Sequence, residues 1–286
     1  INILIMINLS EPNISKKEIS LVTKALNSKN LVDGYYQNSA EKLIKKIIKA
    51  KYVAVTQSCS SALEAASILI NLKKNDEVLM PSYNYNTTAS SFVRTGCKIQ
   101  YCDIDKKNLM PTFEQIKKYV TKKTKVIIII HMQGLPIDYL DKLKNFCELK
   151  KIILIEDAAP ALGSYFKNKP LGSFGDFATF SFHETKNYTS GLGGLLVINN
   201  KKFRRLSDLV FDKGTDRTYV TSNKNYYKKY YSWLTLGSSF RMAELNASYL
   251  QPQINDISKV IKYRSKLYKR YLKNLNPWKK NFFSIC

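Results

Sequence analysis

Apolar and polar residues alternate along the first 200 residues in patterns that predict helices and strands in turn. Residues 15–27 are expected to form a helix, because Ile19, Val22 and Leu26 recur at helical spacing. Ser15 and Glu18 stand at the spacing of a capping box at its start. Further helices are expected over residues 39–50, 113–120 and 138–149, and another begins within 58–66.

Seven short apolar runs predict strands between these helices. They cover residues 52–55, 77–80, 98–102, 126–131, 152–156, 178–182 and 195–198. Runs such as 126–130 are apolar at every position, which is typical of a sheet that helices cover on both faces. The pattern therefore predicts an α/β fold.

The character of the chain changes after residue 200. Residues 219–231 are polar and rich in Tyr and Lys, so we expect an irregular segment there. Residues 241–275 return to helical periodicity and predict one long helix or two, kinked or divided at Pro252.

The chain is strongly basic. Its 286 residues include 46 Lys and Arg against 22 Asp and Glu, a net charge of +24. Such an excess can indicate nucleic-acid binding, which stays an alternative. Only 7 of the 46 are Arg, however, and no helix-turn-helix, zinc-finger or RNP signature is present, so we expect no nucleic acid as partner. A polyanionic small ligand would benefit from the same field.

The five cysteines contain no CxxC pair, and the chain has only two histidines. We therefore expect no metal site and a reduced, cytoplasmic setting. No apolar run approaches the roughly 20 residues that span a bilayer, and a secretory signal is not expected.

Polar residues follow three of the predicted strands, where ligands bind in parallel sheets. Ser58-Cys59-Ser60-Ser61 joins a strand to a helix and could bind phosphate, or could simply cap the helix. Asp157 ends an apolar strand, where burial calls for a cationic or donor partner, although it could also cap the next turn.

The third group is Lys186, which follows the strand at 178–182 and precedes Gly191, Gly193 and Gly194. A lysine that has lost water can act as an amine nucleophile toward a carbonyl, as Schiff-base chemistry requires. The alternative is an ordinary solvated lysine. The order of phosphate site, strand-end Asp and then Ser-x-x-x-x-Lys favours the reactive interpretation.

That order resembles the fold-type I enzymes that use pyridoxal 5′-phosphate. The motifs resemble the DegT/DnrJ/EryC1/StrS family of nucleotide-sugar aminotransferases, over residues 8–275. The resembling strings lie at residues 76–83, 156–159, 172–176, 180–186 and 237–242. Residues 180–189 with 237–239 look most like the dTDP-4-amino-4,6-dideoxygalactose transaminase branch.

The resemblance implies a role for each matching residue. Lys186 would bind the cofactor covalently and move a proton, while Asp157 would pair with its ring nitrogen. Tyr85 would stack on the ring, and His183 is grouped with the catalytic residues because it lies near Lys186 in the motif. The phosphate would be bound by Ser60, Ser61 and Ser181, with Ser239 reaching it across a dimer interface.

The resemblance also implies the architecture and the reaction. The fold would be that of the PLP-dependent transferases, with a mostly parallel seven-stranded sheet and helices on both faces. Residues 1–240 would form the large cofactor-binding domain with an N-terminal helical arm, and 241–286 a long helix and the start of a C-terminal small domain that is largely missing. A homodimer would transfer an amino group from an amino acid, by family habit glutamate, to a nucleotide-linked 4-keto-6-deoxyhexose such as dTDP-4-keto-6-deoxyglucose for glycan synthesis.

Two residues depart from the family pattern. Pro160 stands where Gln or His usually contacts the cofactor, and Leu192 replaces a Glu in the glycine turn. A non-catalytic or truncated relative that binds the cofactor or the sugar nucleotide is therefore an alternative. Lys186 is retained, whereas family members that carry His there are dehydratases, and this favours amino transfer.

Overall fold

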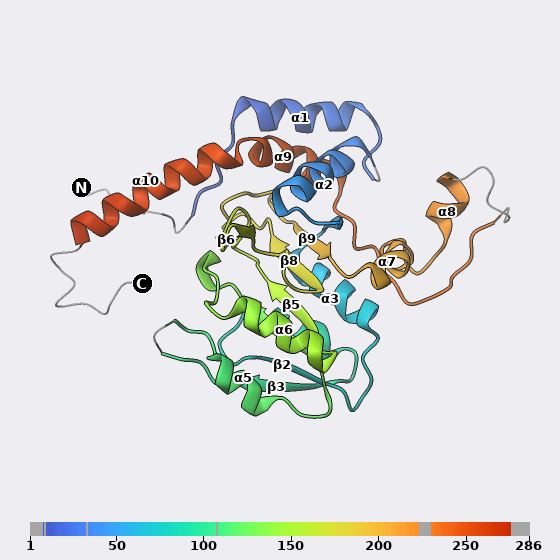
Figure 1. Ribbon diagram of the computed structural model, residues 1–286. Helices are drawn as coiled ribbons and strands as arrows, with labels where there is room; N and C mark the ends of the chain where they lie inside the picture. Colours follow the sequence, from blue (N-terminus) through green and yellow to red (C-terminus); the bar gives the residue numbers. More distant parts are fainter. Residues whose placement is uncertain (1–7, 9, 33, 107, 223–229, 276–286) are drawn as a thin grey trace, which may run out of the picture.

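The computed structural model describes residues 8, 10–32, 34–106, 108–222 and 230–275 (Figure 1). Its centre is a seven-stranded sheet in the order β1-β9-β8-β5-β4-β2-β3. Only β9 runs antiparallel to its neighbours, so the predicted mostly parallel α/β sheet is confirmed. The strands are β1 (Tyr52–Thr56), β2 (Glu77–Pro81), β3 (Lys98–Cys102), β4 (Thr124–Ile130), β5 (Ile153–Asp157), β8 (Phe177–Ser181) and β9 (Gly194–Ile198). A separate hairpin pairs β6 (Tyr165–Phe166) with β7 (Lys169–Pro170).

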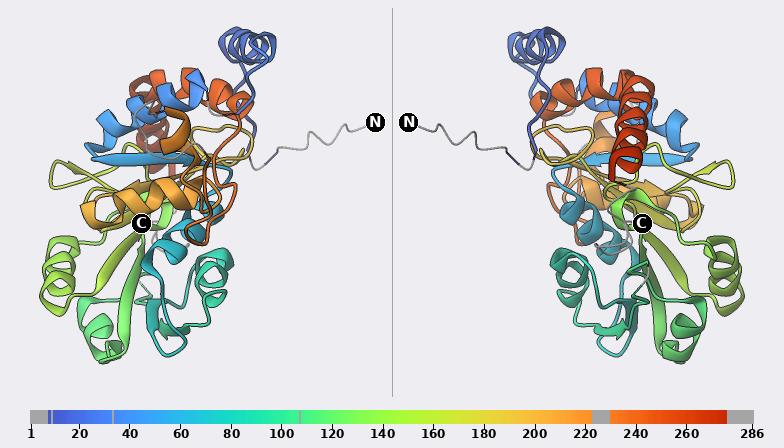
Figure 2. Two further views of the ribbon diagram at one scale, coloured as in Figure 1. Left: turned by 90° about the vertical axis from the view of Figure 1, so that its right-hand side faces the viewer. Right: turned by 90° about the vertical axis from the view of Figure 1, so that its left-hand side faces the viewer.

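Helices cover both faces of the sheet (Figures 1 and 2). One face packs against α3 (Cys59–Ile70), α4 (Asn86–Val93) and α7 (Arg204–Phe211). The other packs against α2 (Tyr35–Ile48), α5 (Phe113–Tyr119), α6 (Leu140–Lys150) and α9 (Glu244–Asn255). Val126 and Ile128 join the first core while Ile127 and Ile129 join the second, which explains why this strand is apolar throughout.

The remaining helices lie at the periphery. They are α1 (Lys16–Asn27), α8 (Arg217–Ser222), α10 (Ile257–Leu275) and the short 3₁₀ turns η1 (Met132–Gly134) and η2 (Lys201–Phe203). The capping box of α1 is confirmed, since Ser15 accepts from the N–H of Lys17 and Glu18 reaches back to the N–H of Ser15 at 2.8 Å. Figure 1 shows α10 extending away from the sheet.

Helix α2 begins four residues before the predicted start at Ser39. Its first N–H groups are capped by the carboxylate of Glu244, at the start of α9. That carboxylate accepts from the N–H of Gly34 at 3.1 Å, of Tyr36 at 2.8 Å and of Gln37 at 2.9 Å. The expected start was wrong because the acceptor comes from more than 200 residues away.

The C-terminal helical segment is divided in two, but the division lies at Asp256 rather than at Pro252. Pro252 is buried within α9, and the N–H of Asp256 still bonds its carbonyl at 3.1 Å. The carboxylate of Asp256 pairs with Lys17 and Lys259, at 3.1 and 2.7 Å, so charged partners accompany the break.

The segment predicted to be irregular begins as a helix, since α8 includes residues 219–222. Asp212 explains this difference, because its carboxylate accepts from the N–H and hydroxyl of Thr218 at 3.0 and 2.7 Å and so caps the first turn. Residues 223–229 lie outside the described residues. No helix within the described ranges is long and apolar enough to cross a membrane.

Candidate active site

The carboxyl ends of β1, β5 and β8 lie at one edge of the sheet and carry the three predicted groups. Ser58 follows β1, Asp157 ends β5, Ser181 ends β8, and Lys186 lies in the turn after β8. The antiparallel strand β9 begins at the same edge with Gly194, which pairs with both Thr56 and Ser181. This edge is therefore where the predicted groups can act together.

The serine motif forms the N-terminus of α3. Ser58 is the N-cap, and its Oγ accepts from the N–H of Ser61 at 3.0 Å and lies 3.0 Å from the Ser61 hydroxyl. Ser60 donates its hydroxyl to Oγ1 of Thr87 at 2.9 Å. Helix capping is thus part of what this motif does, but the first N–H groups of a helix also favour an anion.

Gly194 packs directly against this helix start. A Cβ atom at Gly194 would lie 2.3 Å from the carbonyl carbon of Ser58 and 2.4 Å from the nitrogen of Cys59. Only glycine permits this approach, which brings the β9 backbone against the serine motif.

Asp157 is almost fully buried, with 4% of its surface exposed. Its Oδ2 accepts from the hydroxyl of Thr88 at 2.8 Å, and its Oδ1 from the N–H of Ala159 at 3.2 Å. Loss of water on burial raises the pKa of the carboxyl, while these two bonds, His131 and Lys186 act in the opposite direction. A buried carboxyl in this position favours a cationic partner.

Lys186 lies half-buried in the turn after β8, where its N–H bonds the carbonyl of His183 at 2.9 Å. Its charge lowers the pKa of both Asp157 and Cys59, so its ammonium acts on the same small region as these groups. His183 is exposed, and its Nδ1 lies 3.1 Å from the hydroxyl of Thr185.

The other predicted residues surround this region. The carbonyl of Ser239 accepts from Nε2 of Gln57 at 2.7 Å, which brings its backbone next to the serine motif within the same chain. Ser181 bonds the carbonyl of Ala159 through its N–H at 3.1 Å. Tyr85 precedes α4 and is 73% exposed, and its carbonyl accepts from the N–H of Thr88.

Sequence interpretation gave no individual role to three residues of this region. Thr88 bonds Asp157, and Thr87 bonds Ser60, so α4 contacts both the acidic and the serine groups. Cys59 lies within the predicted serine motif, and desolvation followed by the charge of Asp157 raises the pKa of its thiol. The only signal for the two threonines was their place two and three residues after Tyr85.

The two residues that depart from the family pattern, Pro160 and Leu192, both lie in turns. Pro160 is half-buried two residues after Ala158 in the turn that follows β5, and offers no side-chain hydrogen bond. Leu192 is exposed in the glycine turn before β9.

Glu156 and Asp176, which belong to the quoted motifs, have structural contacts instead. The carboxylate of Glu156 accepts from the N–H groups of Gly172, Phe174 and Gly175, at 2.7–2.9 Å, and from Nε2 of His131. It therefore holds the turn that leads into β8.

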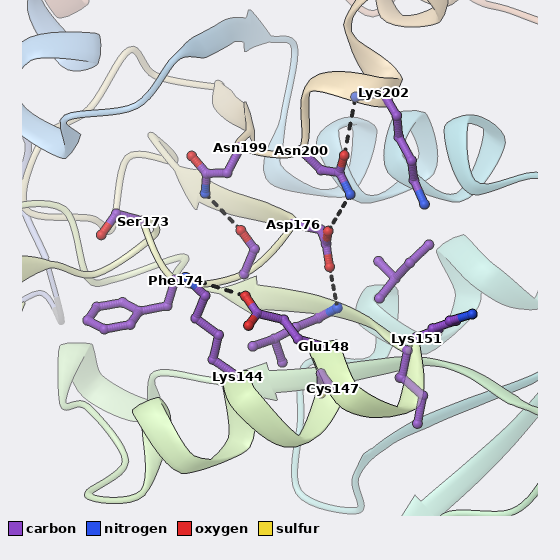
Figure 3. Close-up of a pocket in the computed structure, with 14 residues that line it drawn as sticks. Lys144, Cys147, Glu148, Lys151, Ser173, Phe174, Asp176, Asn199, Asn200 and Lys202 are labelled. Atoms are coloured by element: carbon purple, nitrogen blue, oxygen red, sulfur yellow. Dashed lines mark hydrogen bonds and ion pairs between the residues drawn. The ribbon is translucent and has the colours of Figure 1, made fainter.

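Asp176 lines a cavity of about 520 Å³ at the opposite edge of the sheet (Figure 3). Its carboxylate accepts from the N–H of Leu154 at 3.0 Å and from Nδ2 of Asn200 at 2.6 Å. Asn199 is in turn bonded to the carbonyls of Gly172 and Gly175. The hydrogen-bonding groups of Asp176, Asn199 and Asn200 thus bond one another or the neighbouring backbone. The cavity is therefore a structural part of the fold and lies away from Asp157 and Lys186. Across the described ranges, no cluster of His, Cys, Asp and Glu is arranged to hold a metal.

Comparison with known proteins identifies the family of the chain. The model of the DegT/DnrJ/EryC1/StrS aminotransferase family matches residues 12–284. GDP-perosamine synthase of Vibrio cholerae is 28% identical over 273 residues, which cover 94% of this chain and 71% of that protein. The spore coat polysaccharide biosynthesis protein SpsC of Bacillus subtilis is 30% identical over 266 residues, covering 92% of this chain and 67% of that protein.

A solved structure gives the same fold. The Escherichia coli GDP-4-keto-6-deoxy-D-mannose-3-dehydratase with bound hydrated PLP superposes with a TM-score of 0.85 at 25% identity, covering 95% of this chain and 73% of that one. With a family model that matches nearly its whole length, this chain belongs to the DegT/DnrJ/EryC1/StrS aminotransferase family.

Proposed function

We propose that this chain transfers an amino group from an amino acid to a keto group on a nucleotide-linked deoxysugar. Members of its family use pyridoxal 5′-phosphate. The observation that carries the proposal is the buried carboxyl of Asp157, with the amine of Lys186 acting on it, at the edge where the serine motif begins α3.

The residues of this edge fit that cofactor. The helix start formed by Ser58, Ser60 and Ser61, held against Gly194, suits a phosphate. The buried carboxyl of Asp157, whose pKa burial raises, suits a cationic ring nitrogen. When bound, the cofactor supplies an aldehyde that takes up the amino group and a ring that withdraws electrons.

The chain's own residues would bind the cofactor and move the proton. Lys186 would hold the cofactor through Nζ, with loss of water from the aldehyde. Once the incoming amino group has displaced it, the same Nζ would take and return a proton. Asp157 would keep the ring nitrogen protonated. Ser60, Ser61 and Ser181 would fix the phosphate, with Ser239 beside them. Tyr85 would cover one face of the ring, and His183 lies at the same turn as Lys186.

For the acceptor we propose a nucleotide-linked 4-keto-6-deoxyhexose, with dTDP-4-keto-6-deoxyglucose as the first candidate, and glutamate as the donor. The product would be an amino sugar for glycan synthesis. The similarity to a GDP-perosamine synthase and to a polysaccharide biosynthesis protein supports a sugar-nucleotide acceptor. The basic charge of +24 favours the approach of a diphosphate.

We further propose a homodimer with the site at its interface, in a cytoplasmic setting. Exposed large apolar side chains support the dimer, since Tyr85, Trp233 and Leu236 are all more than 70% exposed. Four of the cysteines are free thiols, which fits a reducing compartment.

The test combines two measurements on purified protein with added pyridoxal 5′-phosphate. Glutamate alone should convert the bound cofactor to its amine form in a single turnover. A panel of dTDP-, GDP- and UDP-linked keto sugars should then show which acceptor restores the aldehyde form. Cofactor binding without conversion by glutamate would favour the non-catalytic relative instead, and protein that stays colourless with the cofactor would contradict the proposal.

A further inference from the structure

The hydroxyl of Thr88 makes a hydrogen bond that is unusual for a threonine in a helix. It is the third residue of α4 and is buried, with 1% of its surface exposed. Threonine and serine in helices commonly bond a carbonyl of the preceding turn, as Ser91 does with the carbonyl of Thr87 at 2.7 Å. Thr88 instead donates across to Oδ2 of Asp157, in β5, at 2.8 Å.

This bond fixes the carboxylate of Asp157 in one orientation. The terminal torsion of an aspartate is broad and roughly two-fold, so a single contact leaves it free to turn. Here Oδ2 is bonded by Thr88 and Oδ1 by the N–H of Ala159, from opposite neighbours. Within the described part of the chain, Thr88 donates the one side-chain hydrogen bond to this carboxylate.

The titratable groups around Asp157 do not replace that contact. Lys186 approaches from the turn after β8, Cys59 from the start of α3, and His131 from the end of β4. Nε2 of His131 is already bonded to Glu156, and Lys186 acts on Asp157 through its charge alone. Burial and the charge of Asp157 raise the pKa of the Cys59 thiol, so this group stays neutral. A hydrogen bond to an ionised carboxylate is stronger than one to a neutral acceptor, so Thr88 also favours the charged form.

We propose that Thr88 is a positioning residue that acts through Asp157 to strengthen the binding of this chain to the ring nitrogen of pyridoxal 5′-phosphate. The proposal rests on the proposed function, and it extends that function to a residue outside the quoted motifs. Thr88 would not touch the cofactor. Its hydroxyl would keep the Asp157 carboxylate ionised. It would also hold the carboxylate in the orientation that faces the ring nitrogen.

Two probes separate this role from a merely structural one. The first is pyridoxal 5′-phosphate, and the second is its analogue in which carbon replaces the ring nitrogen, which keeps the aldehyde and the phosphate. Dissociation constants of both probes would be measured by absorbance for the wild type and for Thr88→Val and Thr88→Ser. Thr95→Val is the matched control, because Thr95 lies just beyond α4 and its hydroxyl donates to the backbone carbonyl of Phe92, at 2.8 Å, rather than to a carboxylate.

Thr88→Val should weaken binding of pyridoxal 5′-phosphate about tenfold to a hundredfold, the range for a lost hydrogen bond to a charged group. Binding of the nitrogen-free analogue should change less than about threefold, and Thr88→Ser should restore wild-type affinity. Equal weakening of both probes, or no weakening of either, would overturn the role of Thr88. If the wild type binds neither probe, the proposed function itself fails. Should Thr88→Val not fold, Thr88→Ala removes the same donor with a smaller side chain.

Discussion

Glu156 and Asp157 are consecutive residues of β5 whose carboxylates serve opposite faces of the sheet. Glu156 bonds the turn at residues 172–175 and His131, and is fully buried. Asp157 bonds Thr88 of α4 on the other face. Because side chains alternate along a strand, one acidic pair provides a structural anchor and a candidate cofactor ligand.

Glu156→Ala should lower the free energy of unfolding by about 3–5 kcal/mol, because it leaves three backbone N–H groups and His131 buried without an acceptor. Urea unfolding followed by circular dichroism measures this. Glu148→Ala is the control, since Glu148 is exposed and lies 3.7 Å from Lys144, and it should change stability by less than about 1 kcal/mol. Equal stability of the two variants would contradict the structural role of Glu156.

Asp157→Asn should behave in the opposite way. The amide removes a carboxyl whose pKa burial raises, so the free energy of unfolding without cofactor should stay equal or increase at pH 7 and above. Affinity for pyridoxal 5′-phosphate should fall by at least tenfold, because the ring nitrogen loses its anionic partner. Melting curves and absorbance titrations on the same preparation report both effects. A variant that is less stable than the wild type yet keeps its affinity for the cofactor would reverse the assignment of the two acids.

Glu244→Ala should lower the free energy of unfolding by about 1–3 kcal/mol. The change removes the carboxylate that caps α2 through the N–H groups of Gly34, Tyr36 and Gln37. Glu11→Ala removes an exposed carboxylate and should have little effect. Hydrogen exchange should show faster exchange at the first turn of α2 in Glu244→Ala, and unchanged protection there would rule out the cap.

Stability should depend on pH through Glu41. Burial raises the pKa of this carboxyl to about 7, and Arg241, at 3.9 Å, and the N–H of Val55 offset only part of that. A raised carboxyl pKa means that the folded state holds the proton more tightly. The cost is therefore absent below about pH 4.5 and complete above about pH 7, where it reaches about 3 kcal/mol.

Glu41→Gln should remove this cost. Its gain in unfolding free energy over the wild type should be small at pH 5 and larger by about 2–3 kcal/mol at pH 8, as measured by urea unfolding. The glutamine can still accept from the N–H of Val55, so the contact with β1 is kept. A gain that is the same at both pH values would show that Glu41 does not titrate in this range.

The sheet was predictable because its strands are buried on both faces. Such burial requires uninterrupted apolar runs, such as residues 126–130. Membership of the family was predictable from its motifs, and the family match confirms it. Element ends were less predictable where a distant residue sets them, as Glu244 does for α2 and Asp212 for α8. The sequence shows the helix but not the remote acceptor.

Only the residues of the candidate site that lie in recognisable sequence motifs were predictable. Asp157 and Lys186 stand out because each follows an apolar strand, and their roles stay predictions. Thr88 does not stand out, because its contact with Asp157 depends on how α4 crosses β5. The domain boundary at residue 240 also stays a prediction.

The proposed function depends most on a covalent bond between Lys186 and the cofactor, and borohydride trapping can detect that bond. Protein loaded with pyridoxal 5′-phosphate would be reduced, digested and analysed by peptide mass spectrometry. We expect one modified peptide, which carries Lys186 out of the 39 lysines, in the wild type and in the surface control Lys122→Ala, and none in Lys186→Ala. A label on another lysine, or one spread over many lysines and unaffected by Lys186→Ala, would contradict the proposed role of Lys186.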